Sequence, residues 1–324
     1  MLTIREALSE GGASLTAAGI ASPGLDASLL LAQALGVSRS SLLAAGAQPL
    51  AQEALAVYRG FIQRRLAGEC VAYIIGKKEF YGLEFLVNPS VLVPRPETET
   101  LVEAALEIIG ASHIEPSVRD AKTQSTRPLE SGRVLDLCTG SGAVAIALKH
   151  AVPQLEVWAT DISAEALETA QANAKRLLPP NSINFRLSDL FIGIRGGCSK
   201  TEHLASNPSP LTPHPSPTSS LLPFTLIVSN PPYVSSADIA GLPAEVRAEP
   251  LLALDGGCEG LDIIKKIIAE AQAFLCPGGI ALMEADPAQM DKIAVMFAER
   301  GFCKIHTCPD LTGRQRVICA QLPI

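Results

Sequence analysis

The chain has 324 residues, of which 48% are hydrophobic, and its formal net charge is −7. This length suits one large domain together with a small one, and the acidic balance gives no general attraction to nucleic acid. No apolar run is long enough for a membrane span, and the start MLTIREALSE carries charges where a signal peptide would be apolar, so we expect a cytoplasmic protein.

The eight cysteines form no CxxC pair, and several lie in apolar, strand-like runs such as RVICAQL around Cys319. Free thiols are the ordinary state of such residues in a cytoplasmic protein. The cysteines therefore predict free, mostly buried thiols rather than disulfides or metal ligands, and we expect no metal site.

Residues 1–75 are predicted to form a small helical domain. Thr3 and Glu6 have the spacing of a capping box, and apolar residues then recur at helical intervals through LDASLLLAQALG and LAQEALAVYRGFIQRRLAG. Residues 1–90 contain seven basic and seven acidic side chains, so this domain is not a basic arm for nucleic acid.

Residues 76–95 are predicted to be a β-hairpin linker, because EFYGLEFLV followed by VLVP alternates and is rich in aromatic and branched residues. A helix should follow, with Pro96 in its first turn and the acidic Glu97 and Glu99 at its positive end.

From residue 96 to residue 324 the pattern alternates between strands and helices, which predicts a doubly wound, mostly parallel sheet of the Rossmann-like α/β class. The expected strands are Val134–Leu137, Val157–Thr160, Asn184–Leu187, Phe224–Ser229 and Ile280–Glu284. The end of the chain, GFCKIHTCPDLTGRQRVICAQL, indicates two further strands as an antiparallel edge.

Two stretches interrupt this alternation. Residues 112–131 are polar and irregular, and residues 195–222 are dense in Pro, Ser and Thr, which is typical of a flexible surface insertion. The sequence SNPSP at 206–210 has no strand before it and no aromatic residue after it, so we interpret it as linker.

The stretch VLDLCTGSGAVAIAL indicates a strand, a glycine turn and a helix, with an acidic residue, Asp136, near the strand end. Glycines in such a turn let the backbone approach a ligand at the helix N-terminus. A nicotinamide site is not excluded by this turn alone, nor is a tight turn without a ligand. The predicted cofactor-binding residues of the turn are Cys138, Thr139, Gly140, Ser141 and Gly142.

Acidic residues at the ends of the next two strands extend this candidate site. Asp161 lies 19 residues after Gly142, where a carboxylate would bind the two hydroxyls of a ribose, although it could instead cap the following helix. Asp189 and Leu190 would meet an adenine by a hydrogen bond and by packing. Together these residues predict a cofactor that contains adenosine.

The fourth predicted strand ends in SNPPY, across the topological switch point from the glycine turn. Two prolines alone can stop a strand, but that explanation requires neither Asn230 nor Tyr233. An amide or exocyclic amine is a poor nucleophile, and a site can help by accepting both of its N–H groups. The Asn230 side-chain oxygen and the Pro231 carbonyl would accept them, Pro232 would add rigidity and Tyr233 a planar face, which is catalysis by orientation.

These motifs are similar to those of S-adenosylmethionine-dependent amino-methyltransferases. The stretch YIIGKKEFYGLEFLVNPSVLVPRPETETLV, with EPLLALDGGCEGLDIIKKII and DLTGRQRVI, resembles more narrowly the HemK-like family of peptide chain release factor glutamine methyltransferases, over nearly the whole chain. The resemblance implies N5-methylation of the glutamine in the Gly-Gly-Gln motif of release factors. It also adds Asn230 to the cofactor-binding residues. The chain departs from the family at Cys138, usually Gly, and at Glu284-Ala285-Asp286, commonly Glu-Ile-Gly.

The sequence thus predicts an enzyme with a helical substrate-recognition domain (1–75), a hairpin linker (76–95) and a methyltransferase domain (96–324). We expect a monomer that acts on release factors and binds neither nucleic acid nor membranes directly. The alternative enzyme class is an amino-methyltransferase acting on nucleic acid, at adenine N6 or guanine N2. A non-catalytic adaptor with a cofactor pocket is the third possibility, and it would bind the cofactor without transferring its methyl group.

Overall fold

The protein is described by a computed structural model that covers residues 2–110, 132–194 and 223–324. These residues form two compact units, one of Met1–Val93 with Ala237–Leu254 and one of Pro94–Ser236 with Asp255–Ile324. The predicted polar stretch 112–131 and the predicted insertion 195–222, with its SNPSP sequence, lie outside the described residues. Among the described residues, no helix is both long and apolar enough to cross a membrane.

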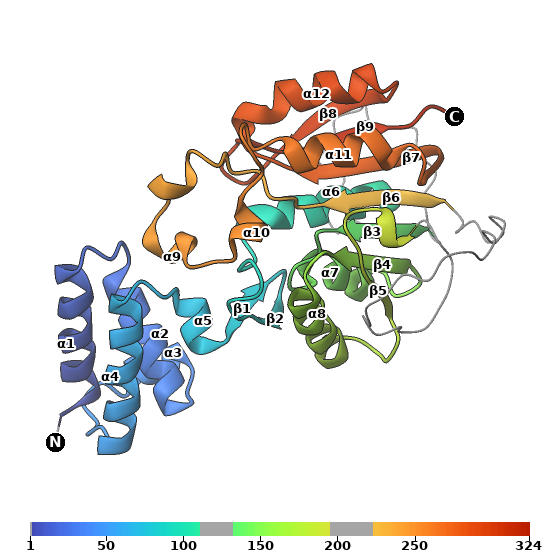
Figure 1. Cartoon of the computed structure of the whole chain (residues 1–324). Helices are drawn as coiled ribbons and strands as arrows, with labels where there is room; N and C mark the ends of the chain where they lie inside the picture. The colour runs from blue at the N-terminus through green and yellow to red at the C-terminus, as the bar shows by residue number, and fades with distance from the viewer. Residues whose placement is uncertain (1, 111–131, 195–222) are drawn as a thin grey trace, which may run out of the picture. The chain divides into compact units, whose positions relative to one another are not determined.

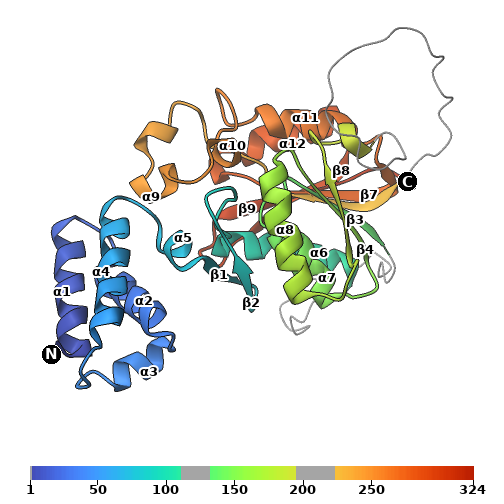
Figure 2. The ribbon, with the colours of Figure 1, turned by 60° about the horizontal axis from the view of Figure 1, so that its bottom comes forward.

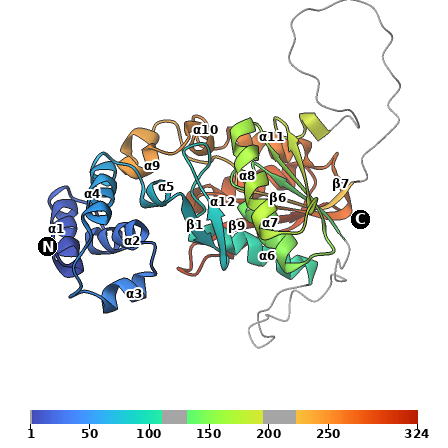
Figure 3. The same cartoon turned by 90° about the horizontal axis from the view of Figure 1, so that it is seen from below.

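The first unit is built from helices and one hairpin (Figures 1 and 3). Its elements are α1 (Ile4–Ala17), α2 (Pro23–Leu35), α3 (Arg39–Ala44), α4 (Gln52–Leu66), α5 (Val71–Ile75), β1 (Lys77–Phe80), β2 (Leu83–Leu86), η4 (Ile239–Gly241), α9 (Ala244–Arg247) and α10 (Leu251–Leu254). The capping box predicted at Thr3 and Glu6 is present at the start of α1. The hairpin pairs Lys77–Phe80 with Leu83–Leu86, whereas the VLVP stretch forms no strand.

The amphipathic pattern of the first unit gives it a core of its own. Large fully buried side chains from α1, α2 and α4, including Leu15, Leu30, Leu31 and Tyr58, pack together there. The first unit differs in two ways from the helical domain predicted for residues 1–75. The unit includes the hairpin, and it also contains Ala237–Leu254, which follows the NPPY sequence.

The second unit contains a seven-stranded sheet in the order β5-β4-β3-β6-β7-β9-β8 among the described residues. Its elements are η1 (Pro96–Thr98), α6 (Glu99–Ile109), β3 (Arg133–Leu137), α7 (Ala143–Ala151), β4 (Glu156–Asp161), α8 (Ala164–Leu177), β5 (Ile183–Leu187), η3 (Ile192–Ile194), β6 (Phe224–Ser229), α11 (Asp262–Ala271), β7 (Leu275–Glu284), η5 (Pro287–Gln289), α12 (Met290–Glu299), β8 (Cys303–Pro309) and β9 (Gln315–Gln321).

The five strands β3 to β7 run parallel to one another, and β9 pairs antiparallel with both β7 and β8. This arrangement confirms the predicted Rossmann-like sheet and its antiparallel edge. Figure 2 shows α6, α7 and α8 on one face of the sheet and α11 and α12 on the other.

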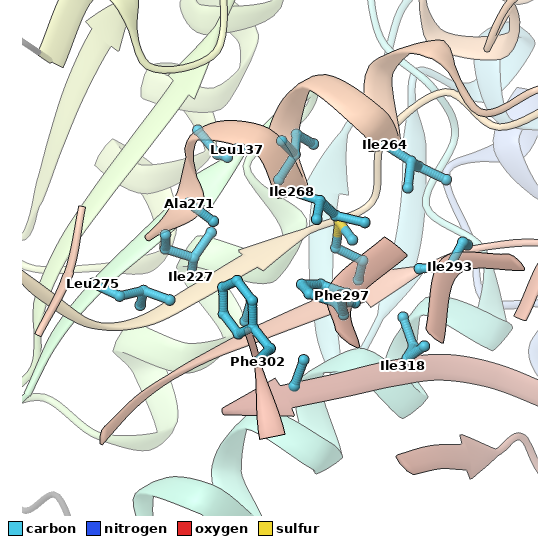
Figure 4. Close-up of a cluster of buried hydrophobic side chains, with 14 of the residues drawn as sticks. Leu137, Ile227, Ile264, Ile268, Ala271, Leu275, Ile293, Phe297, Phe302 and Ile318 are labelled. Atoms are coloured by element: carbon cyan, nitrogen blue, oxygen red, sulfur yellow. The ribbon is translucent and has the colours of Figure 1, made fainter. Parts of the chain in front are cut away.

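The core that supports the sheet lies largely under α11 and α12 (Figure 4). Ile264 and Ile268 of α11 and Phe297 of α12 are buried against the sheet side chains Ile227 and Ile318. These strands are nearly continuous apolar runs because both of their faces are covered by helices. A rigid sheet of this kind fixes the positions of the loops at its carboxyl edge.

The seven cysteines in the described part of the chain are free thiols. Cys70 and Cys319 are buried, four others are partly buried, and Cys258 is exposed.

Candidate active site at the carboxyl edge of the sheet

The glycine turn connects β3 to α7 and is held by the neighbouring strand. The Thr139 N–H donates to the Thr160 carbonyl at 2.9 Å, and the Gly142 N–H donates back to Thr139 at 2.8 Å. Gly142 has a φ of +81°, which favours glycine, and a Cβ there would lie 3.1 Å from Ala170 Cβ and 3.3 Å from the backbone Cα of the same residue of α8, so the close approach of the two helices also disfavours a side chain. α7 begins directly after this turn and directs its N-terminal N–H groups to the same edge.

Cys138, one of the departures from the family pattern, has a left-handed backbone with φ +59°. This conformation explains why glycine suits the position, since a side chain there costs about 1–2 kcal/mol. We expect Cys138→Gly to change the free energy of unfolding by less than about 1 kcal/mol, because relief of this strain is offset by the greater freedom of glycine in the unfolded chain. Urea denaturation would measure it, and a loss above 2 kcal/mol would show that the thiol contributes packing that this balance omits.

Asp136 supports the turn from beneath and is almost completely buried. Its Oδ2 accepts a hydrogen bond from Thr139 Oγ1 at 2.6 Å and from the Ala145 N–H at 3.2 Å. Burial raises the pKa of this carboxyl to about 7, and the two hydrogen bonds oppose that rise. Asp136 therefore links the glycine turn to the first turn of α7.

Asp161 connects β4 to the glycine turn. Its Oδ2 accepts from the Gly140 N–H at 2.8 Å and its Oδ1 from the Ser163 N–H at 3.0 Å. Burial raises the pKa of the Asp161 carboxyl. The N-cap of α8 is Ser163, whose side chain accepts from Ala166, so capping does not account for Asp161. Its role as ribose ligand stays a prediction.

The residues after β5 have two different environments. Asp189 is exposed, so its carboxylate is available to a ligand. Leu190 has a φ of +47°, and its partly buried side chain packs against the core of the unit. The predicted contacts of both residues with adenine remain predictions.

The NPPY sequence follows β6, which is adjacent to β3. Because Ser229 pairs with Leu137, Asn230 and Cys138 are the next residues on two neighbouring parallel strands. The Ser229 hydroxyl also donates to the Leu137 carbonyl at 2.8 Å. The switch point predicted from the sequence therefore places the start of NPPY directly beside the start of the glycine turn.

The polar side chains of NPPY are held by residues from two other segments. Asn230 Nδ2 donates to Thr98 Oγ1 at 3.1 Å, and Thr98 ends η1. The Tyr233 hydroxyl donates to Glu284 Oε1 at 3.1 Å, and Glu284 ends β7. Pro231 is buried, which fixes the carbonyl that precedes Pro232.

Glu284 is fully buried and was not among the predicted site residues. Burial raises its pKa to about 7, while hydrogen bonds from Thr98 and Tyr233 and the charge of Arg316 act in the opposite direction. In the described part of the chain its Oε2 has no hydrogen-bond partner. Thr98 and Glu284 were not predicted as site residues because, in the sequence, the first marks only a helix start and the second only a strand end.

The two buried carboxyls predict that stability depends on pH. The pKa values of Asp136 and Glu284 rise from 3.8 and 4.5 to about 7 on folding. At a pH between the unfolded and the folded pKa values, the two carboxyls are protonated in the folded chain and ionised in the unfolded chain. The stabilisation that they give at low pH is therefore lost as pH rises through about 7. We expect the urea midpoint to be lower at pH 8 than at pH 5.5, and Glu284→Gln and Asp136→Asn each to reduce that difference. A midpoint that increases toward pH 8 would contradict this prediction.

The site fits an adenosine-containing cofactor by the chemistry of its donors. A carboxylate at the end of β4, an exposed carboxylate after β5 and a glycine turn before a helix N-terminus share one edge of the sheet. The Thr160 hydroxyl, next to Asp161, is buried and has no hydrogen-bond partner among the described residues. Within the described ranges, no group of three His, Cys, Asp or Glu residues could hold a metal ion.

Known protein families and curated relatives match this chain, and the relatives match it over nearly its whole length. The family model described as the PrmC N-terminal domain matches residues 6–76, and the one described as the methyltransferase small domain matches residues 121–214. A release factor glutamine methyltransferase of Deinococcus radiodurans is 37% identical over 320 residues, covering 99% of both chains. One of Moorella thermoacetica is 35% identical over 320 residues, covering 98% of both.

A solved structure shows the same fold. The catalytic domain of hMettl16, in complex with the MAT2A 3′UTR hairpin 1, has a TM-score of 0.51 and 12% identity. It covers 81% of this chain and 80% of that chain. At this identity the likeness concerns the fold alone.

Proposed function

The chain belongs to the family of release factor glutamine methyltransferases, and from this premise we propose that it methylates the side-chain amide nitrogen, N5, of the glutamine in the Gly-Gly-Gln motif of release factors. The methyl donor is S-adenosylmethionine, and release factors are the protein partners. The observation that supports this assignment best is Asn230, an amide side chain oriented by Thr98 beside the glycine turn.

The proposed residues act by orientation. Asn230 Oδ1 and the Pro231 carbonyl accept the two N–H groups of the glutamine amide and aim its nitrogen. The buried Pro231 keeps its carbonyl fixed, and the face of Tyr233 packs against the acceptor. S-adenosylmethionine, when bound, supplies an electrophilic methyl group on a sulfonium sulfur. The amide nitrogen would take up that methyl group and release one proton to solvent, so positioning of the nitrogen by Asn230 and Pro231 would be the protein's main contribution.

Asp161 and the turn residues 138–142 would hold the adenosine and methionine parts of the cofactor, with Asp189 and Leu190 beside the adenine. A nucleic-acid amino-methyltransferase would share NPPY, but a net charge of −7 does not favour a polyanionic substrate.

The test of this function is transfer of a labelled methyl group from S-adenosylmethionine to purified release factor, compared with DNA and ribosomal RNA. We expect label on wild-type release factor and none on a release factor whose Gly-Gly-Gln glutamine is replaced. Label on that variant, or better transfer to DNA or RNA, would exclude the proposed acceptor while leaving the methyltransferase assignment intact.

Replacing Asp161 tests the cofactor site. We expect Asp161→Ala to weaken S-adenosylmethionine binding by roughly 1–3 kcal/mol, because a charge-assisted pair of hydrogen bonds is lost. Calorimetry measures the affinity, and circular dichroism checks that the variant remains folded, since Asp161 also binds the Gly140 N–H. Glu165→Ala, which removes an exposed carboxylate from the first turn of α8, is the control. Equal affinity of a folded Asp161→Ala variant and the wild type would show that another residue binds the ribose.

A further inference from the structure

The side chain of Gln289, the last residue of η5, joins three segments of the second unit. Its Nε2 donates to the Tyr233 carbonyl at 3.0 Å and to the carbonyls of Glu259 and Gly260 at 3.1 and 3.3 Å. Its Oε1 accepts from the Asp286 N–H at 3.2 Å. Backbone carbonyls only accept and a backbone N–H only donates, so these four partners fix which way the Gln289 amide faces. One of the partners is the tyrosine of NPPY.

The loop of residues 255–260, with the sequence DGGCEG, packs its backbone directly against NPPY. A Cβ on Gly256 would lie 2.6 Å from the Pro232 carbonyl oxygen and 2.8 Å from Tyr233 Cα. A Cβ on Gly260 would collide with the Tyr233 carbonyl oxygen. Glycine is needed at both positions because another backbone approaches so closely. The loop therefore fits one position of the NPPY backbone.

The two prolines of NPPY make its position depend on these contacts. Pro231 and Pro232 have no N–H with which to hold the segment, and the ring fixes the φ angle of each. The segment is held before NPPY by the pairing of β6 with β3. After NPPY it is held at Val234, whose carbonyl accepts from the Gly256 N–H at 2.8 Å. A displacement of the Tyr233 carbonyl is therefore transmitted through stiff residues to the Pro231 carbonyl.

We propose that Gln289 is a positioning residue for methyl transfer. By holding the Tyr233 carbonyl it fixes the end of NPPY, and through the two prolines it fixes the Pro231 carbonyl that accepts an N–H of the acceptor amide. Gly256 leaves the space in which this backbone lies. The proposal rests on the proposed roles of Pro231 and Tyr233, and it assigns Gln289 no contact with the substrate or the cofactor.

Gln289→Met tests the proposal by removing the donor while keeping the length of the side chain. We expect kcat at saturating S-adenosylmethionine and release factor to fall about 10-fold or more, with the affinity for S-adenosylmethionine changed less than about 3-fold. The matched control is Gln321→Met. Gln321 is also partly buried, and its Nε2 donates to the Gly278 carbonyl at 2.8 Å, in the first half of β7. This control should keep kcat within about 2-fold of the wild type.

Fluorine NMR of the full chain labelled with 3-fluorotyrosine gives a readout besides activity. The chain contains four tyrosines, and the variant Tyr233→Phe assigns the resonance of Tyr233. We expect Gln289→Met to shift or broaden this resonance and to leave the other three unchanged. Gln321→Met should leave all four unchanged. A general loss of stability would not act on one tyrosine in this way.

Gly256→Ala is an independent test if Gln289→Met does not fold. Its added methyl group meets the backbone of NPPY, so we expect kcat to fall as it does in Gln289→Met. Gly279→Ala is the control, because its Cβ would lie 2.9 Å from the Cys276 carbonyl oxygen, where crowding should leave kcat unchanged. In the double variant Gly256→Ala/Gln289→Met the two losses should not multiply, because both displace one segment.

The proposal is overturned if a folded Gln289→Met or Gly256→Ala variant keeps wild-type kcat or an unchanged Tyr233 resonance, or if its loss lies in cofactor affinity. It is also overturned if Gln321→Met lowers kcat equally. These outcomes are distinguishable from failure of the proposed function, because each compares variants on whichever acceptor the wild type methylates. Absence of transfer to release factor by the wild-type enzyme would instead contradict the proposed function.

Discussion

Replacement of Asn230 with alanine is expected to lower the rate of methyl transfer by about 10²-fold or more, the scale of losing a positioning contact at the reacting atom. S-adenosylmethionine affinity should remain nearly intact, because the amide is expected to bind mainly the acceptor. Its Nδ2 is already occupied by Thr98 in the folded chain, so the loss concerns the side that faces away from Thr98. Single-turnover methyl transfer with bound cofactor, together with calorimetry of cofactor binding, separates these two effects.

Asn230→Asp refines this test. A carboxylate can still accept the N–H of the acceptor amide, but it cannot donate to Thr98. We therefore expect activity above that of Asn230→Ala and below that of the wild type. Asn184→Ala, at an exposed position of β5, is the matched control and should be as active as the wild type. Wild-type transfer by Asn230→Ala would remove Asn230 from the site.

Much of the second unit could be predicted from the sequence because its signals are local. The parallel strands are short apolar runs, and each is bounded by residues that stop strands or begin helices. Once the sheet is assigned, its handedness and strand order bring the residues after Leu137 and Ser229 together. The glycine turn and NPPY were therefore correctly placed on adjacent strands.

The contacts that orient the site could not be predicted, since they join residues far apart in the sequence. Thr98 and Asn230 are 132 residues apart, and Tyr233 and Glu284 are 51 apart. In the sequence, Thr98 is one residue of a helix start, and Glu284 is one acidic residue at the end of an apolar strand. Only the structure shows that the Glu284 carboxyl is buried and which groups surround it.

The extent of the first unit differs from the predicted domain for a related reason. Residues 237–254 directly follow the NPPY region, and their short helices have no periodic pattern that assigns them to the first unit. They belong to it in the structure, and one connection is an ion pair between Arg65 of α4 and Glu245 of α9. The side chain of Arg65 is almost completely buried, although an arginine at the end of a helix usually lies in solvent.

Replacement of Arg65 with alanine is expected to destabilise the first unit by about 3–5 kcal/mol. Arg65 Nε donates to Asp26 Oδ2 at 2.8 Å, and the two side chains are 5% and 6% exposed, so the substitution leaves in the interior a carboxylate that has lost its counter-charge and keeps only the bond from Ser22. Far-UV circular dichroism of the full chain in urea would follow the helices. The single tryptophan, Trp158, lies on β4 and its fluorescence reports on the second unit separately.

Arg59→Ala is the matched control, because the pair between Arg59 and Glu10 is 55% and 49% exposed and should contribute less than about 1 kcal/mol. The double variant Asp26→Leu/Arg65→Met distinguishes two causes of the destabilisation: loss of a favourable ion pair, and burial of Asp26 without its counter-charge. If the cost of Arg65→Ala arises from the unpaired Asp26, replacing both charges with apolar side chains should recover most of the lost stability. A double variant as unstable as Arg65→Ala would instead assign the loss to the other bonds of Arg65, those to Glu245 and to the Glu69 carbonyl.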